Sequence, residues 1–336
     1  MVSPQDEYFH ERNDSPFWNE SAWFSFAIPE RDTNGFIYFY HRPNLGFSVG
    51  GCGLWDPTGD SAHTCIHHQW DMHPLAPETN MFDFSLPSGL SVECVEPLHT
   101  YRITYNSPDC EMELTWRAFM APAASGFSQG LAEWAVGAVK DGASGKGHYE
   151  QMGRMTGSVL MEGERLEIDC FSARDHSWGP REISEVARGD WPWAVVSEDH
   201  AFFVVASSDL KPEQDPGHGT TERIGAGWYR RNGVTSSVVT GTRRAERDPQ
   251  GRPVKVVVEA TDELGRELHA VATPVNLLNW QGYPFMLVWW SLARWEVNGE
   301  QGWGEVQDYW PINQSRRLIR RPVREGVAWT AQPSLS

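Results

Sequence analysis

One short segment of the chain concentrates side chains that could carry out acid–base chemistry. It consists of Arg174, Asp175, His176, Ser177, Trp178, Gly179, Pro180 and Arg181, and it directly follows a predicted strand. Burial against Trp178 would raise the pKa of Asp175, whereas the two arginines or a protonated histidine of the segment would lower it. If burial prevails, Asp175 is a general acid. If the arginines prevail, it is a structural anion that holds a turn.

Two further polar residues precede this segment. His148 and Glu150 are separated by one residue, so they share a face if this part of the chain is a strand. Such a pair could orient the acid, accept the returning proton or position a water molecule. The alternative is that both residues belong to the hydrogen-bonded interior of a barrel.

A second group of candidate ligands lies between residues 63 and 73. It contains imidazole, thiol and carboxylate groups, which are the ligand types of zinc sites. The spacing matches no established zinc motif, and two adjacent histidines would point to opposite faces of a strand. The alternative is a polar strand whose histidines face solvent or line a pocket, where His41 could join them. The metal-ligand candidates are His63, His67, His68, Asp71 and His73.

Tryptophan is frequent in this chain. There are 17 Trp residues, several of them in pairs or clusters such as Trp191 with Trp193. On alternating positions of strands, such side chains would line a cavity with flat apolar walls that suits a small hydrophobic molecule. The alternative is that they are simply large core residues.

The elements that must position these residues are predicted to be strands. Helical periodicity is almost absent, and short runs of alternating or wholly apolar residues recur between Gly, Pro, Asn and Asp. Asn232-Gly233 and Asn298-Gly299 supply the positive φ that two-residue type I′ hairpins need. The pattern predicts strands at residues 36–40, 90–95, 101–105, 112–119, 158–161, 165–171, 193–197, 201–206, 224–230, 235–242, 254–261, 285–297 and 304–310.

The 336 residues are enough for about two domains of ~150 residues each. The composition changes at residues 184–190, after which the strand pattern restarts, so the boundary is placed there. Closure of each sheet would hide the edges of so many strands. The predicted fold class is therefore all-β, with two consecutive antiparallel β-barrel or sandwich domains at residues 1–183 and 184–336. Residues 123–147 are predicted to form a lid or crossing loop that includes a short helix.

The charge balance excludes several classes of function. With 28 Lys and Arg against 45 Asp and Glu, the net charge of −17 argues against a nucleic-acid surface. The only basic run, five arginines within residues 316–324, is interpreted as solvated residues beside a strand. No apolar stretch approaches the ~20 residues that span a membrane, and the start lacks a basic and apolar leader. A cytoplasmic location without stable membrane insertion is expected.

Motifs for organic cofactors are missing as well. The sequence has neither a Walker A loop nor a GxGxxG pattern after a strand, so no cofactor is expected. Residues 126–130 fit GxSxG but lack the strand-to-helix setting that this motif requires. The five cysteines are odd in number and widely spaced, and most are expected to be buried thiols.

Several motifs together resemble a known superfamily. They are Gly147-His148-Tyr149-Glu150-Gln151, Gly157-Ser158-Val159, Asp175-His176-Ser177-Trp178-Gly179-Pro180-Arg181, Tyr40-His41-Arg42-Pro43-Asn44-Leu45-Gly46 and Trp55-Asp56-Pro57. The chain resembles the lipocalin-like superfamily that includes bacterial carotenoid 1,2-hydratases and fungal lipocalin-like Diels-Alderases, and within it a largely unassigned bacterial branch. The most specific element is Asp-His-x-Trp-Gly. The resemblance covers much of the first half and continues more weakly through the second.

The resemblance implies two lipocalin-like domains and roles for particular residues. In the carotenoid hydratases, the aspartate that corresponds to Asp175 is the proposed proton donor to an isoprenoid double bond, and Trp178 would be a nearby aromatic wall. Those enzymes have Tyr-His before the aspartate, where this chain has Ala173-Arg174. This difference bears on the substrate and on the protonation step. Protonation of an alkene creates a carbocation, which requires a neutral acid, aromatic faces and controlled access of water.

The expected function is that of an acid–base enzyme of hydratase, dehydratase or cyclase type, acting on a lipophilic isoprenoid, steroid or polyketide-like substrate. Two alternatives stay open: a non-catalytic carrier of a hydrophobic ligand, and a metal-dependent hydrolase or lyase that uses residues 63–73. The expected catalytic residues are Asp175, His176, His148 and Glu150. The expected substrate-binding residues are Trp178, Trp191, Trp193, Arg174, Arg181, His41 and Tyr40.

Overall fold

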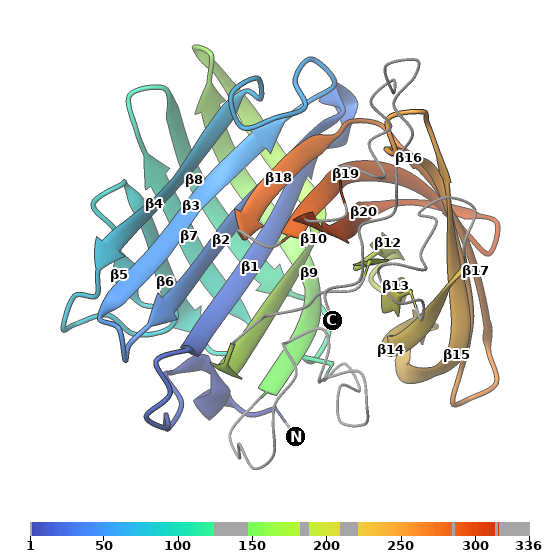
Figure 1. Ribbon diagram of the computed structural model, residues 1–336, viewed down its shortest axis with the longest axis horizontal. Coiled ribbons are helices and arrows are strands. Elements are labelled where there is room, and N and C mark those ends of the chain that lie inside the picture. The colour runs from blue at the N-terminus through green and yellow to red at the C-terminus, as the bar shows by residue number, and fades with distance from the viewer. Residues whose placement is uncertain are drawn as a thin grey trace, which may run out of the picture.

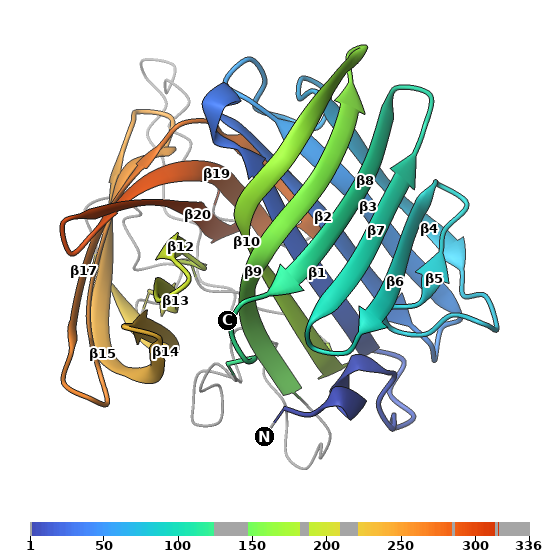
Figure 2. The same ribbon diagram turned by 180° about the vertical axis from the view of Figure 1, so that it is seen from behind.

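The computed structural model describes residues 2–123, 147–181, 188–208, 221–283, 286–312 and 315. These residues form two ten-stranded antiparallel sheets that lie side by side (Figure 1; Figure 2). The predicted all-β fold class is therefore confirmed. The boundary predicted at residues 183 and 184 falls outside the described residues. The first sheet ends at Pro180 and the second begins at Gly189.

The first sheet pairs mostly strands that are neighbours in the sequence. Its order is β4-β3-β2-β1-β10-β9-β8-β7-β6-β5, so the long-range pairing joins β1 to β10. The sheet curls, which places β1 to β4 opposite β6 to β8 (Figure 1). Short 3-10 turns lie at Pro4–Glu7 (η1) and Pro29–Arg31 (η2). The strands are β1 (Trp18–Ile28), β2 (Thr33–Arg42), β3 (Phe47–Trp55), β4 (His67–Pro74), β5 (Phe84–Ser85), β6 (Leu90–Glu96), β7 (Thr100–Asn106), β8 (Cys110–Ala118), β9 (Gly147–Met161) and β10 (Glu164–Pro180).

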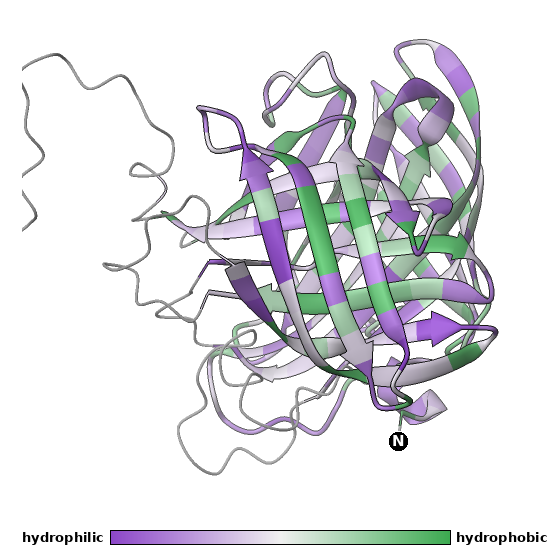
Figure 3. Cartoon of the chain, turned by 90° about the vertical axis from the view of Figure 1, so that its right-hand side faces the viewer, coloured by the Kyte–Doolittle hydropathy of each residue, from purple (hydrophilic) through white to green (hydrophobic). Residues whose placement is uncertain are grey.

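The second sheet closes into a barrel. β20 pairs with both β12 and β19, and β19 also pairs with β17, which completes a ring of eight strands. Buried and exposed residues alternate along β16 and β17, as a barrel wall with one wet face requires (Figure 3). The strands are β11 (Gly189–Asp190), β12 (Trp193–Ser197), β13 (His200–Ser207), β14 (Thr221–Arg231), β15 (Val234–Arg247), β16 (Pro253–Asp262), β17 (Glu267–Pro274), β18 (Leu278–Tyr283), β19 (Met286–Val297) and β20 (Glu300–Pro311).

Two of the hairpin turns follow from their sequence. Asn232 and Gly233 have φ values of 53° and 74°, and Asn298 and Gly299 have values of 48° and 86°. Positive φ at both central residues defines the type I′ turn, and Asn-Gly tolerates it best. The predicted hairpins between β14 and β15 and between β19 and β20 are thus confirmed.

Alternation along the strands produces three main cores. One fills the inside of the curled first sheet, around Phe24 and Trp116. Another fills the second barrel, around Phe202 and Trp295. The third lies between the two sheets and takes residues from both, and we call it the interface core. Its large aromatic members are Trp23, Phe36, Tyr38, Trp55, Trp193, Phe203, Trp228, Trp280, Trp290 and Tyr309.

Polar contacts also join the two sheets. Asn34 Nδ2 donates a hydrogen bond to Glu305 Oε1 at 2.8 Å, and Trp55 Nε1 donates to Asn276 Oδ1 at 3.0 Å. All four residues are buried, so these bonds are shielded from competition by water. They therefore fix how the two sheets face each other.

Three predicted features fall outside the described residues: the short helix within residues 123–147, the GxSxG pattern at 126–130 and the arginines of 316–324. Among the residues that are described, no helix is long and apolar enough to cross a membrane.

Candidate active site between the two sheets

Strand β10 extends to Pro180 and so includes most of the polar segment that the sequence places after a predicted strand. Because side chains alternate in a strand, neighbouring residues of this segment point to opposite faces. Asp175 shares the face of Ala173, which belongs to the interface core. The residues that point inward, to the inside of the first sheet, are Arg174, His176 and Trp178. The polar side chains of the segment are thus divided between the two faces of the first sheet.

Asp175 lies beside a second carboxyl group. In the sheet it is opposite Glu150 of β9 on one side and Trp23 of β1 on the other. The backbone N–H of Trp23 donates to Asp175 Oδ1 at 2.8 Å, and His148 Nε2 lies 2.9 Å from Glu150 Oε1. One ligand-type atom from each of His148, Glu150 and Asp175 lies within 4.8 Å of the other two. The structure therefore brings three of the four expected catalytic residues together.

Burial controls the protonation of this group. It raises the pKa of Asp175 to about 7, with a further contribution from neighbouring Glu150, against the opposing effects of His148 and Arg181. Burial also raises the pKa of Glu150 well above its usual value and lowers that of His148 to about 4. At neutral pH, His148 is consequently uncharged and Asp175 is close to half protonated. Both carboxyl groups thus hold their protons more strongly than exposed carboxyl groups do.

Two polar atoms of this group have no hydrogen-bond partner among the described residues. They are Glu150 Oε2 and Trp23 Nε1, and both side chains are buried. Buried polar atoms in folded proteins are nearly always paired. The acceptor and the donor left here are available to a water molecule or to a polar group of a ligand.

A row of aromatic rings leads up to the carboxyl pair. Trp70 of β4, Tyr38 of β2 and Trp23 of β1 occupy one register line that ends at Asp175. Gly51 of β3 fills the remaining position of the row. Because it has no side chain, the rings of Tyr38 and Trp70 stack above it at 5.4 Å with an interplanar angle of 1°. A Cβ atom at Gly51 would lie only 1.7 Å from the carbonyl oxygen of Gln69.

The second sheet completes this aromatic surface. Trp193 and Trp290 contact Trp23 with ring centroids 6.3 and 6.0 Å away, and Trp280 packs against Tyr38 at 6.0 Å. Edge-on and tilted ring contacts of this kind are favourable and leave π faces exposed to other groups. The carboxyl pair therefore lies at the end of a surface made by aromatic residues of both sheets.

Polar residues continue beyond the carboxyl pair on the same face. Arg181 donates through Nη2 to Ser177 Oγ, which lies 3.0 Å from Ser21 Oγ. Tyr40 is opposite Ser21 in the neighbouring strand and packs against the interface core. Of the expected substrate-binding residues, Arg181 and Tyr40 therefore lie on the face of Asp175, and Trp193 of the second sheet packs against Trp23 on that face. Trp191 packs at the same core, with its ring 4.1 Å from that of Tyr309.

The other expected binding residues are on the inner face and do not reach Asp175. Arg174 is fully buried there, with Nη2 3.0 Å from Glu7 Oε1. Trp178 stacks on His10 at 3.9 Å instead of forming a wall beside Asp175. His41 Nδ1 lies 2.7 Å from Ser48 Oγ. His176 also points inward, because the segment is a strand and odd and even residues separate.

The histidines of residues 63–73 are not assembled into a site. His67 Nε2 lies 3.1 Å from Tyr105 Oη, whereas adjacent His68 packs near Phe36 at 6.4 Å. His73 Nε2 is 3.8 Å from Asp71 Oδ2. Among the described residues, two groups of three side chains have the spacing of metal ligands, and neither contains His63, His67, His68, Asp71 or His73.

A groove also opens between the sheets. It has a volume of about 490 Å³ and is lined by loop residues including Thr64, Asp248 and Asn276. None of the expected site residues lines it.

The sequence did not reveal several residues that shape the site. Trp23, Tyr38 and Trp70 come from three strands, and their meeting depends on the register between β4 and β1. Glu305 was also missed. It accepts hydrogen bonds from Trp290 Nε1 at 2.8 Å and from Trp193 Nε1 at 3.3 Å, so it holds two of the aromatic rings in place. Gln307 and Asp308 belong to the same predicted strand, so nothing in the sequence distinguishes Glu305 from its polar neighbours.

The profile of a protein family described as a domain of unknown function, DUF7064, matches residues 3–312. The chain belongs to this family. No curated protein matches the DUF7064 chain in sequence.

Solved structures share the fold of this DUF7064 chain at low sequence identity. A proposed AttH protein from Nitrosomonas europaea is 16% identical, with a TM-score of 0.62 over 91% of this chain and 96% of that one. Kievitone hydratase from Nectria haematococca is 14% identical, with a TM-score of 0.53 over 92% of each chain. CghA, solved with Sch210972, is 12% identical, with a TM-score of 0.55 over 87% of this chain and 88% of that one. The DUF7064 chain thus has the two-domain lipocalin-like fold that the sequence motifs indicate.

Proposed function

We propose that this protein is an acid–base enzyme that acts on a lipophilic isoprenoid, steroid or polyketide-like substrate, with Asp175 as the proton donor. One observation carries the proposal. A buried carboxyl group, Glu150, and a half-buried one, Asp175, lie side by side at the end of an aromatic surface, and no arginine or lysine forms a direct ion pair with either of them in the described residues. Kievitone hydratase, which has the same fold, supports a reaction of hydratase type.

The arrangement suits protonation of a carbon–carbon double bond. Asp175 transfers its proton to the alkene, and the carbocation that forms lies over the π faces of Trp23 and Tyr38. Glu150 beside it raises the pKa of Asp175 and so helps to keep the proton on the donor until the substrate is in place. His148 holds Glu150 in place through the 2.9 Å contact. Capture of the cation by water, which then returns a proton to the Asp175 carboxylate, gives a hydratase, and capture by an internal nucleophile gives a cyclase.

Isotope incorporation tests the proposed step directly. The protein is incubated with a panel of isoprenoid, steroid and polyketide-like alkenes in D₂O containing H₂¹⁸O, and the products are analysed by mass spectrometry. Because Asp175 exchanges its proton with solvent, protonation of the alkene leaves one carbon-bound deuterium in the product. Hydration adds one ¹⁸O as well, whereas cyclisation adds none.

Two variants provide the comparison. Asp175→Asn should reduce turnover ~10²- to 10⁴-fold, the usual contribution of a general acid. Asp169→Asn is the matched control, because Asp169 lies on the same strand, is exposed and pairs with Arg154. Equal turnover by the two variants would contradict the role of Asp175. Binding of the same compounds by wild type and Asp175→Asn, with no product from either, would instead identify a carrier.

A further inference from the structure

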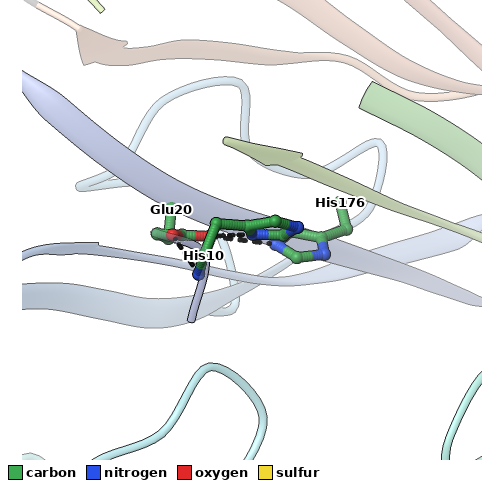
Figure 4. Close-up of side chains that lie close together, drawn as sticks. All are labelled: His10, Glu20 and His176. Atoms are coloured by element: carbon green, nitrogen blue, oxygen red, sulfur yellow. Dashed lines mark hydrogen bonds and ion pairs between the residues drawn. The ribbon is translucent and has the colours of Figure 1, made fainter. Parts of the chain in front are cut away.

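A second cluster of polar side chains lies on the inner face of the same strands. His10 precedes the first strand, Glu20 is on β1 and His176 is on β10, and the three side chains point toward one another (Figure 4). The side chains of Glu20 and His176 are completely buried, and that of His10 is 16% exposed. The sheet separates this cluster from Asp175, so the proposed acid–base chemistry does not use it.

The spacing of the three side chains matches that of ligands around a tetrahedral metal ion. His10 Nδ1 lies 3.0 Å from Glu20 Oε2, and His176 Nε2 lies 3.6 Å from the same oxygen. Zinc bonds of about 2.0–2.1 Å in a tetrahedral arrangement separate neighbouring ligand atoms by about 3.4 Å. The three atoms therefore already lie near the corners of such a site.

Neighbouring groups orient two of the three ligands. His10 Nε2, the ring nitrogen that faces away from the cluster, lies 3.3 Å from Asp6 Oδ1. Glu20 Oε1, the other carboxylate oxygen, accepts hydrogen bonds from Trp18 Nε1 at 3.1 Å and from the His10 backbone N–H at 2.9 Å. Outer contacts of this kind, including a carboxylate on the second nitrogen of a histidine, are typical of metal sites. They leave His10 Nδ1 and Glu20 Oε2 directed at the centre of the cluster.

His176 distinguishes this cluster from an ordinary ion pair. Neither ring nitrogen of this buried side chain has a hydrogen-bond partner among the described residues. The 3.6 Å contact with Glu20 is too long for a hydrogen bond. Burial lowers the pKa of His176, which keeps the ring in the neutral form that binds metals. An unpaired neutral imidazole aimed at a carboxylate is what a metal ion between them would explain.

Two imidazole nitrogens and one carboxylate oxygen form the donor set of zinc sites and of 2-His-1-carboxylate iron sites, whereas Ca²⁺ and Mg²⁺ prefer oxygen ligands alone. We propose that His10, Glu20 and His176 bind a divalent transition-metal ion such as Zn²⁺. This ion would fasten the N-terminal segment, residues 2–17, to the inner face of the first sheet. Since His10 belongs to the segment and the other two ligands to the sheet, the ion joins two parts of the chain that are otherwise held by side-chain contacts.

Metal titration of the full-length protein, prepared without a histidine tag and stripped with a chelator, tests the proposal. Co²⁺ should bind with a stoichiometry of one per chain and give the visible absorption bands of a tetrahedral site, and Zn²⁺ should displace it. Zn²⁺ should also raise the Tm, because it binds the folded chain preferentially. Absence of a stoichiometric Co²⁺ spectrum in the wild type would overturn the proposal.

Three variants localise the binding. His10→Ala removes a ligand outside both sheets, so the fold should be kept while the affinity for Co²⁺ falls more than the ~10- to 100-fold expected from loss of an outer contact. Asp6→Asn removes that outer contact and should have the smaller effect. His63→Ala changes an exposed histidine outside the cluster and should leave binding unchanged. Equal affinity of His10→Ala and the wild type, or loss of binding in His63→Ala, would refute the site.

Discussion

Arg174 and Asp175 are adjacent in the chain but belong to two opposite electrostatic environments. On the inner face, Arg174 forms a buried ion pair with Glu7, and its guanidinium lies 4.4 Å from the ring centre of Tyr101 and 5.2 Å from that of Tyr149. Both tyrosine hydroxyls donate hydrogen bonds to Glu7. On the outer face, which is turned toward the second sheet, Asp175 accepts one backbone hydrogen bond and lies beside another carboxyl group.

The difference shows how one strand serves two purposes. Burial alone would raise the pKa of Glu7, but the Arg174 charge and the hydrogen bonds hold it below its usual value. Glu7 therefore stays ionised, and the inner face contributes to stability. At Asp175 the opposing effects of His148, Arg181 and the Trp23 backbone are smaller than the effect of burial, so its carboxyl group retains a proton at the expense of stability. Groups with this kind of perturbed pKa are typical of functional sites.

The largest expected effect comes from breaking the inner pair. Arg174→Met should lower the free energy of unfolding by about 3–5 kcal/mol, because it leaves the buried Glu7 without its cation. Urea denaturation at neutral pH measures this. Arg165→Met is the control, since Arg165 and its partner Glu111 are about half exposed and such pairs contribute about 0–1 kcal/mol. A similar loss in both variants would remove the distinction between the two faces.

The second effect is the pH dependence of the free energy of unfolding, to which Asp175 on the outer face contributes. The folded-state pKa of Asp175 is raised to about 7 from a usual value of 3.8, so the unfolded chain loses this proton first as the pH rises. Asp175 therefore destabilises the protein progressively between about pH 4 and pH 7, and the full cost is present above pH 7.

Asp175→Asn removes this cost. At pH 8 the variant should exceed the wild type in unfolding free energy by on the order of 4 kcal/mol, and the difference should vanish near pH 4. Denaturation at a series of pH values measures both. A variant that is less stable than the wild type at pH 8 would show that the Asp175 carboxylate is stabilised in the folded state.

A third, smaller effect tests whether the sheet insulates the two faces. Glu150→Gln should lower the pKa of Asp175, because Glu150 is the largest neighbouring charge that raises it. Infrared titration of the Asp175 carboxyl band, assigned with the Asp175→Asn variant, measures the change. Glu7→Gln on the inner face is the comparison and should leave the band where it is. A comparable shift from both substitutions would mean that the faces are coupled.

The smallest effect comes from Arg181. Its charge lowers the pKa of Asp175, so Arg181→Met should raise it. Because Arg181 is only partly buried, added salt should reduce the difference between this variant and the wild type. The same infrared titration at low and high ionic strength measures this. If the pKa difference between the variant and the wild type did not change with salt, Arg181 would act through its hydrogen bond to Ser177 and not through its charge.

Local patterns predicted the fold better than the site. Asn-Gly turns and alternating apolar residues act over a few positions, so the hairpins and most strands of the second sheet could be predicted. β3 was missed because glycines at 50, 51 and 53 suppress its strand signal, and β1 because its residues are buried on both faces and do not alternate in polarity. The pairing of His148 with Glu150 follows from their spacing, and the structure brings them together as predicted.

The placement of the polar segment differs from expectation for one physical reason. The sequence analysis groups residues 174–181 around Asp175 without assigning them to a strand, whereas a strand separates odd from even positions. Trp178 and Arg174 consequently lie on the face opposite to that of Asp175. Trp23 and Tyr38 could not be identified, because their contact with Asp175 depends on the register between strands that are far apart in the sequence.

The pairing of β1 with β10 has a consequence for synthesis of the protein. The bond from the Trp23 backbone to Asp175 spans 152 residues, which a ribosome adds in roughly 8–30 s at about 5–20 residues per second. During that interval β2 can cover one edge of β1, while the edge that will meet β10 has no partner. The unpaired edge presents backbone hydrogen-bonding groups, and β1 also contains several aromatic residues, so this strand is a site of aggregation until β10 has been synthesised. A chaperone that shields Trp18–Ile28 over this period would increase the yield of folded protein.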